Sequence, residues 1–155
     1  MKRLLILSLI TTIFLSAAAD TSGVNMFSAF SHNKDIESVY IGKAMIESAF
    51  AQSDSATIEL IKGIDYVAIY SSSDKASVHT MRTDGFRIIQ DSDLDLIVST
   101  KEDDSGAVAI YGRPYPGESG MFSQIVMFIT GNKTVTIMNF GGKMDLKAIT
   151  TLYTN

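Results

Sequence analysis

The chain has 155 residues, of which 13 are Lys or Arg and 17 are Asp or Glu, so its formal net charge is −4 at pH 7. This acidic balance, without any long basic run, argues against binding to nucleic acid or to an anionic membrane surface. The sequence contains no cysteine, which excludes disulfides, thiol nucleophiles and structural cysteine–zinc sites.

The N-terminal residues 1–19 are predicted to be a cleavable secretory signal peptide. A basic dipeptide precedes a mainly apolar run, Leu4 to Leu15, and Ala17 and Ala19 form the A-x-A pair of a cleavage site. The apolar run is shorter than the roughly twenty residues that a membrane-spanning helix needs. We therefore expect cleavage near Ala19 and a soluble product, in the periplasm or outside the cell, without stable membrane insertion.

The mature part, residues 20–155, is predicted to form a single domain. Its first half is expected to mix helices and strands, because the apolar residues have both periods. The expected elements are a short helix at Met26–Phe30, a strand at Ile36–Ile41, a helix at Lys43–Ala51 with an apolar stripe of Ala44, Met45, Ala49 and Phe50, a helix from an N-cap at Ser53–Ser55 to a C-cap at Gly63, a buried strand at Ile64–Tyr70, and a helix at Lys75–Ile89.

From Leu94 onward the apolar period changes from that of a helix to that of a strand. Strands are expected around Leu94–Ser99, Val108–Ile110, Met121–Thr130 and Thr134–Phe140, joined by an acidic turn, a Pro/Gly-rich loop and a two-residue hairpin at Gly131–Asn132. Gly141 and Gly142 are expected to end the last strand, and Asp145 to cap a final helix. This order predicts an α+β fold: a mainly antiparallel sheet, built from a four-strand C-terminal meander plus one or two earlier strands, with helices packed on one face and a short C-terminal helix.

Four stretches of the mature chain resemble a family of small exported bacterial envelope proteins, catalogued as domain of unknown function 4252. The stretches are Ile36–Ile46, Ile61–Ser72, Leu96–Gly112 and Gln124–Leu152. The last is the most characteristic, with a hairpin, then a glycine, then an Asp-Leu helix. The resemblance implies an α+β fold and a location in the cell envelope, and it brings no established activity. Many members look like lipoproteins, whereas this chain lacks the lipid-bearing cysteine.

Four acidic residues have the spacing of positions 1, 3, 5 and 12 in an EF-hand calcium loop: Asp91, Asp93, Asp95 and Glu102. Position 6 of that loop needs glycine for its sharp turn, and here it is Leu96. The residues that follow indicate a strand. We therefore expect no metal site from this motif.

The sequence carries no recognisable catalytic set. His32 and His79 are its only histidines, and they lack the H-E-x-x-H spacing of a zinc site. His79 has hydroxyl neighbours, but the chain has no G-x-S-x-G elbow to activate a serine. We therefore predict no catalytic residue and no cofactor. The alternative left open is a small periplasmic hydrolase that uses carboxylate or His side chains.

The loop Gly112–Gly120 is the best candidate for a recognition site. It carries Arg113, Tyr115 and Glu118 together with both prolines of the chain. Arg and Tyr are enriched at binding hot spots, and prolines reduce the entropy lost on binding. The alternative is a connection that only keeps two aggregation-prone strands apart.

These observations predict an exported, non-enzymatic binding module of the bacterial cell envelope. Its partner would be another envelope protein or a small ligand, which the sequence does not identify. A further reading is self-association through Met121–Phe140, whose apolar strands could leave an exposed edge.

Overall fold

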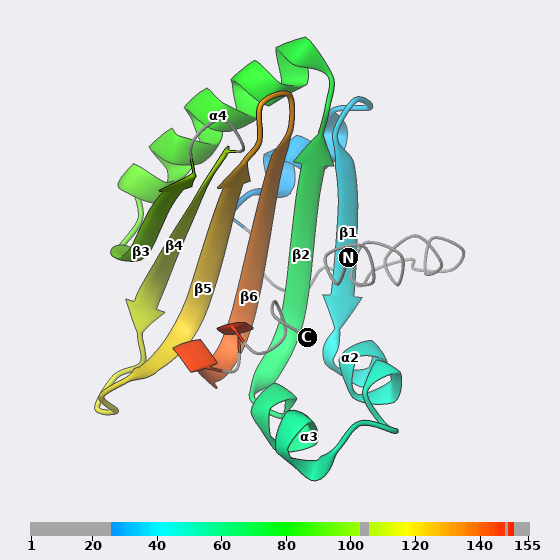
Figure 1. Ribbon diagram of the computed structural model, residues 1–155, viewed down its shortest axis with the longest axis vertical. Helices are drawn as coiled ribbons and strands as arrows, with labels where there is room; N and C mark the ends of the chain where they lie inside the picture. The colour runs from blue at the N-terminus through cyan, green and yellow to red at the C-terminus, as the bar shows by residue number, and fades with distance from the viewer. Residues whose placement is uncertain (1–25, 103–105, 148, 151–155) are drawn as a thin grey trace.

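The computed structural model describes residues 26–102, 106–147 and 149–150 (Figure 1). The predicted signal peptide and residues 103–105 of the acidic turn lie outside the described residues. The described strands are β1 (Glu37–Gly42), β2 (Ile64–Ser72), β3 (Asp95–Glu102), β4 (Gly106–Pro114), β5 (Met121–Thr130) and β6 (Val135–Asp145). The described helices are the 3-10 helix η1 (Ser28–His32) and the α-helices α2 (Lys43–Ala49), α3 (Ser55–Ile61) and α4 (Lys75–Gln90).

The strands form a single antiparallel sheet in the order β1-β2-β6-β5-β4-β3. The last four make the expected meander, and β2 pairs with β6 to bring in the two earlier strands. The chain passes from β2 to the far edge through α4, which runs across the back of the sheet (Figure 1). The predicted α+β fold with an antiparallel sheet is therefore confirmed.

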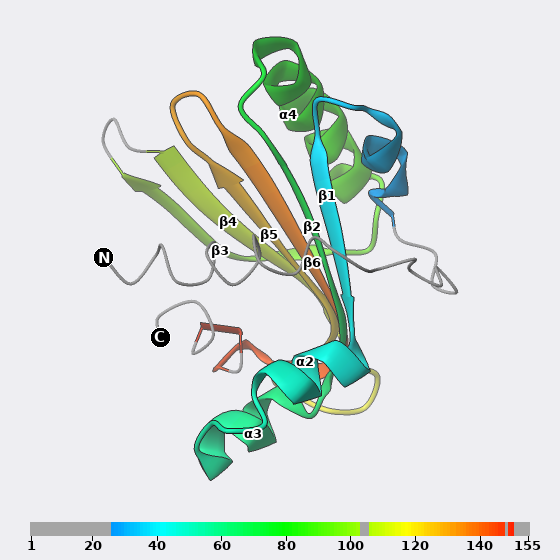
Figure 2. The same cartoon turned by 90° about the vertical axis from the view of Figure 1, so that its right-hand side faces the viewer.

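The helices are not all on one face of the sheet. In Figure 2, α4 and η1 lie on one side, whereas α2 and α3 lie at the lower end. Helix α4 buries Val78, Met81 and Ile89 against the first side. Ile46 of α2 and Ile61 of α3 instead join the apolar cluster of the opposite side. The finer expectation, that the helices share one face, is not confirmed.

The middle of the sheet is buried on both faces. In β5, Val126 and Phe128 join the cluster under α4, while Ile125 and Met127 join the opposite cluster. Strands β5 and β6 each pair with a neighbour on both sides, so they have no free edge. The expectation of an exposed edge within Met121–Phe140 is therefore wrong, because the sheet ends at β1 and β3.

Several boundaries differ from the sequence prediction, and two glycines explain the one at the end of β6. Strand β6 does not stop at Gly141 and Gly142 but continues to Asp145. A Cβ on Gly141 would overlap the ring of Tyr66, and Gly142 has a φ of +142° where its backbone meets the Gly63 carbonyl. These glycines permit close approach between β2 and β6 rather than ending a strand.

One turn and one helix cap also differ. The β5–β6 connection has four residues between the paired Thr130 and Val135 instead of two, and the Gly131 N–H donates to the Thr134 carbonyl at 2.9 Å. The C-cap of α3 is Lys62 in right-handed helical conformation, so Gly63 is not needed as a left-handed cap. Gly63 is needed because a Cβ there would collide with the backbone of β6.

Helix α2 packs against the core with a different face from the predicted apolar stripe. Ile46 is its buried residue, whereas Met45 is 46% exposed. After β6, residues Leu146, Lys147, Ile149 and Thr150 have helical conformation, and Ile149 is buried. The rest of the predicted final helix lies outside the described residues.

Candidate functional site

The predicted recognition loop is shorter and more closed than the sequence suggested. Strand β4 continues to Pro114, so the connection to β5 runs only from Tyr115 to Gly120. The Tyr115 N–H donates to the Met121 carbonyl at 2.8 Å, and the Glu118 N–H donates to the Tyr115 carbonyl at 3.3 Å. Gly117 and Gly120 both have positive φ, which glycine adopts without strain. The backbone of the loop is thus held by its own hydrogen bonds.

Lys143 of β6 brings two of the three predicted site residues together. Its Nζ lies 2.6 Å from Oε1 of Glu118 and 5.0 Å from the centre of the Tyr115 ring. The hydrogen bond to Glu118 raises the pKa of Lys143. Since both charged side chains are about half exposed, the pair contributes little to stability and mainly orients the loop. We call Tyr115, Glu118 and Lys143 the hairpin corner.

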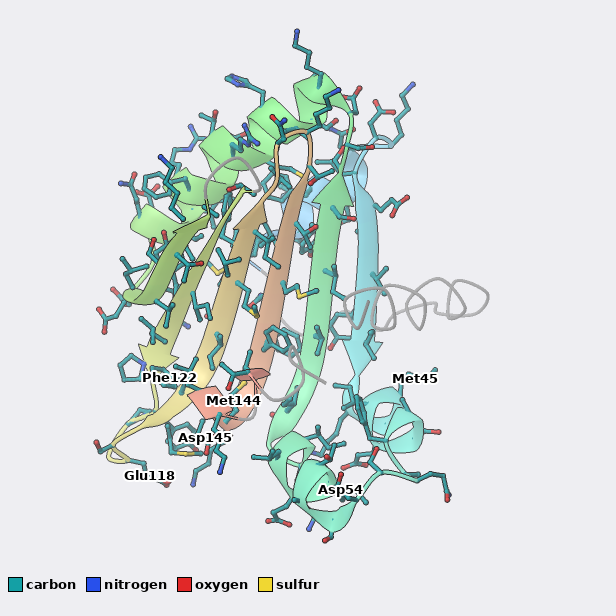
Figure 3. All side chains as sticks on the ribbon, viewed as in Figure 1. Met45, Asp54, Glu118, Phe122, Met144 and Asp145 are labelled. Atoms are coloured by element: carbon teal, nitrogen blue, oxygen red, sulfur yellow. The ribbon has the colours of Figure 1, made fainter. Side chains whose placement is uncertain are left out.

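The hairpin corner lies at one end of the sheet. Figure 3 shows Glu118 beside Phe122, Met144 and Asp145 at the same lower corner of the molecule. Phe122 pairs with Met144 and Met121 pairs with Asp145. The first residues of β5 and the last residues of β6 therefore lie next to the loop. Sequence reasoning did not identify Lys143 in this role, because it lies 25 residues from Glu118 along the chain.

Arg113, the third predicted residue, belongs to a different group. It pairs with Gln124, which pairs with Gly141, which pairs with Tyr66. These residues form a row across β4, β5, β6 and β2, and we call it, with the neighbouring Asn139, the polar row. Arg113 is exposed at one end of the row.

The centre of the polar row is a buried hydrogen-bonded network. Asn139 has no exposed surface and Gln124 is 8% exposed. The Gln124 Nε2 donates to Asn139 Oδ1 at 2.9 Å and to the Met26 sulfur at 3.2 Å. Buried amides are costly unless paired, so this network fixes how β5, β6 and the start of the described chain fit together.

Tyr66 connects this network to Tyr40 on the edge strand β1. Its ring lies over Gly141 and stacks on Tyr40 with centroids 5.8 Å apart. Burial raises the pKa of the Tyr66 hydroxyl, and the neighbouring Tyr40 raises it further, while Asn139 and Arg113 act in the opposite direction. The raised pKa favours the protonated hydroxyl, which can donate a hydrogen bond in this network.

The remaining sequence candidates do not converge on a site. Asp95 and Glu102 are the two ends of the eight-residue strand β3, so seven steps of extended backbone place them roughly 23 Å apart. They cannot bind one calcium ion together. His32 and His79 are both exposed, on η1 and α4. In the part of the chain that the structure describes, no group of three or more His, Asp or Glu residues could hold a metal ion.

None of the helices in the described ranges is long and apolar enough to cross a membrane. Comparison with curated proteins and with solved structures found no match to this chain. The sequence profile of one family, described as Domain of unknown function (DUF4252), matches residues 30–152. This match extends from η1 beyond the end of β6 and so includes every strand of the sheet. The chain therefore belongs to the DUF4252 family.

Proposed function

We propose that the protein is an exported, non-enzymatic binding module of the bacterial cell envelope, and that the hairpin corner is its recognition surface. The observation that carries this proposal is the fixing of Tyr115 and Glu118 by Lys143. A loop that is ordered before binding loses less entropy when its partner docks. The exposed Pro116 and Ser119 lie between and beside these residues, where a partner can reach them.

Export is proposed from the pattern of residues 1–19. The basic start, the short apolar run and the Ala17–Ala19 cleavage motif support it. N-terminal sequencing of the protein from its host should give Asp20 as the first residue. A chain that still begins at Met1 would contradict the proposal.

The recognition surface can be tested with a photocrosslinking residue placed in the living envelope. At Ser119 the probe should give a defined adduct, and Tyr115→Ala in the same chain should remove it. A probe at Lys75, the first residue of α4, is the matched control because it is exposed on a different element. Identical adducts from both probes, or an adduct that survives Tyr115→Ala, would contradict recognition by the hairpin corner.

A further inference from the structure

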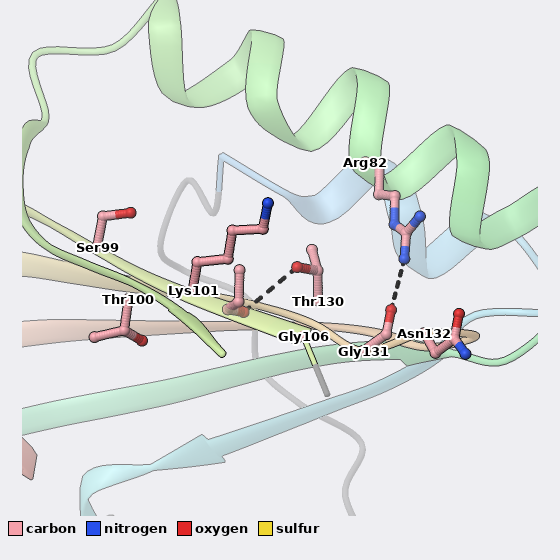
Figure 4. Close-up of a pocket in the computed structure, with 9 residues that line it drawn as sticks. Arg82, Ser99, Thr100, Lys101, Gly106, Thr130, Gly131 and Asn132 are labelled. Atoms are coloured by element: carbon pink, nitrogen blue, oxygen red, sulfur yellow. Dashed lines mark hydrogen bonds between the residues drawn. The ribbon is translucent and has the colours of Figure 1, made fainter. Parts of the chain in front are cut away.

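A second surface, at the opposite end of the sheet from the hairpin corner, forms an open pocket of about 570 Å³. It lies where α4 passes over the edge of the sheet near the β5–β6 turn (Figure 4). The lining residues are Arg82, Ser99, Thr100, Lys101, Gly106, Ala107, Thr130, Gly131 and Asn132. Its volume is in the range of sites that hold small organic ligands.

Arg82 enters the pocket from the helix side. Its Nη2 donates to the Gly131 carbonyl at 2.7 Å, which fixes the guanidinium above the β5–β6 turn. A guanidinium has five N–H donors in a rigid fork, so this bond leaves others for a ligand. Arg82 is exposed and has no carboxylate partner among the described residues.

Lys101 enters from the sheet side. Ser99 and Lys101 are two apart on β3 and therefore share one face of the strand. Figure 4 shows the Lys101 side chain rising toward α4 while Arg82 descends from it. Lys101 has no hydrogen bond or ion pair with any residue that the structure describes. An ammonium ion that pairs with none of the described residues can bind an anionic ligand.

The pocket also differs in charge from the rest of the molecule. Among the residues that the structure describes, its lining contains two cations and no acid, in a chain with a net charge of −4. The hydroxyls of Ser99 and Thr130 and the amide of Asn132 add uncharged hydrogen-bonding groups. Thr130 donates to the Ala107 carbonyl at 3.4 Å, which leaves its oxygen free to accept.

We propose that this pocket binds a small polar ligand through an anionic group, a phosphate or a carboxylate, held between Arg82 and Lys101. Charge-assisted bonds from two cations fix the anionic group. The hydroxyls and Asn132 then contact the uncharged remainder of the ligand. This site is separate from the hairpin corner and does not depend on the function proposed for it.

The test is a titration followed by two-dimensional NMR, with the purified protein in the form that its host produces. The probes are glucose 6-phosphate, glucuronate and, as the uncharged match, glucose. We expect saturable shifts of the Gly131 and Asn132 amides with at least one of the two anions, and none with glucose. The anion that acts identifies the charged group. Equal responses to all three sugars, or no saturable response to either anion, would overturn the proposal.

Substitutions distinguish specific binding in the pocket from general electrostatic attraction of anions to the protein. Lys101→Gln should weaken binding at least tenfold without changing the thermal midpoint, because Lys101 pairs with no residue that the structure describes. Arg87→Gln is the matched control, since Arg87 is on the same helix but pairs with Asp84 at 2.8 Å and does not line the pocket. Equal affinity in Lys101→Gln and the unaltered protein would refute the proposal.

The acidic residues Asp103 and Asp104 follow β3 in the sequence and lie outside the described residues. Replacing both by Asn removes negative charge close to Lys101 in sequence. For an anion site this change should leave binding unchanged or strengthen it. Loss of binding in the double variant would show that the ligand depends on these carboxylates, and would overturn the proposed role of Arg82 and Lys101.

Discussion

Replacement of Gly141 by alanine should destabilise the protein through one contact, with the Tyr66 ring. The added Cβ would overlap Cε1 and Cζ of that ring and would lie 2.8 Å from its hydroxyl oxygen, whereas nonbonded carbons prefer about 3.5–4.0 Å. Overpacking of this kind costs about 1–3 kcal/mol. In a domain of this size that cost lowers the thermal midpoint by roughly 4 °C per kcal/mol.

The same substitution should have the opposite sign once the ring is removed. Gly141 is not in the left-handed region, so alanine there restricts the unfolded chain and stabilises by about 0.4–1 kcal/mol when nothing obstructs it. Urea denaturation of Gly141→Ala, Tyr66→Ala and the double variant completes the thermodynamic cycle. Gly117→Ala is the control, because its φ is +79° with open space around it, and its cost should be equal in both backgrounds. An equal loss from Gly141→Ala with and without Tyr66 would refute the reasoning.

Three other changes test the core and one cap. Asn139→Leu should lower the free energy of unfolding, measured by urea denaturation, by about 1–3 kcal/mol, because the buried Gln124 amide loses its acceptor. Adding Gln124→Met should recover part of this loss. Losses that simply add in the double variant would contradict the pairing. Ile125→Ala should cost about 2–5 kcal/mol by the same assay, and a cost near zero would show that this side chain is not packed. The Thr57 N–H lowers the pKa of the Asp54 carboxyl below 3.8, so its contribution is present above that pH and is lost as the pH falls through the lower, folded-state pKa. Asp54→Ala should therefore be less stable than the unaltered protein at pH 7, and the difference should shrink in acid; a constant difference would contradict the cap.

Much of the fold is encoded locally and could be predicted. The helical stripe in α4 contains Val78 and Met81, which are buried as expected, and the Asp74 side chain accepts from the Ser77 N–H as an N-cap. The change to period two after that helix predicted the meander. The position of α2 could not be predicted, because a helix of seven residues has too few apolar positions to define one face.

The candidate site was predicted only in part, and strand register is the reason. Tyr115 and Glu118 could be selected by residue type, but Lys143 comes opposite them only through the pairing of β5 with β6. The predicted two-residue turn would pair Thr130 with Lys133, whereas Thr130 pairs with Val135. That difference moves the residues of β6 by two positions as far as Gly141, and the irregularity between Phe122 and Gln124 adds one more beyond it. The turn is closed by the hydrogen bond from the Gly131 N–H to the Thr134 carbonyl, which the sequence pattern does not specify.

The glycines that were misread as strand ends connect the fold to the hairpin corner. The Lys143 N–H donates to the Gly63 carbonyl at 2.8 Å, and a Cβ added at Gly142 would collide with the same carbonyl. This contact holds the backbone of Lys143 directly, so it also sets where its side chain meets Glu118. A Cβ on Gly63 or on Gly142 would push β6 away from the start of β2 at this point. The residues that position the proposed recognition surface therefore lie outside that surface. Gly63→Ala should loosen the loop, although Gly63 is not part of the loop.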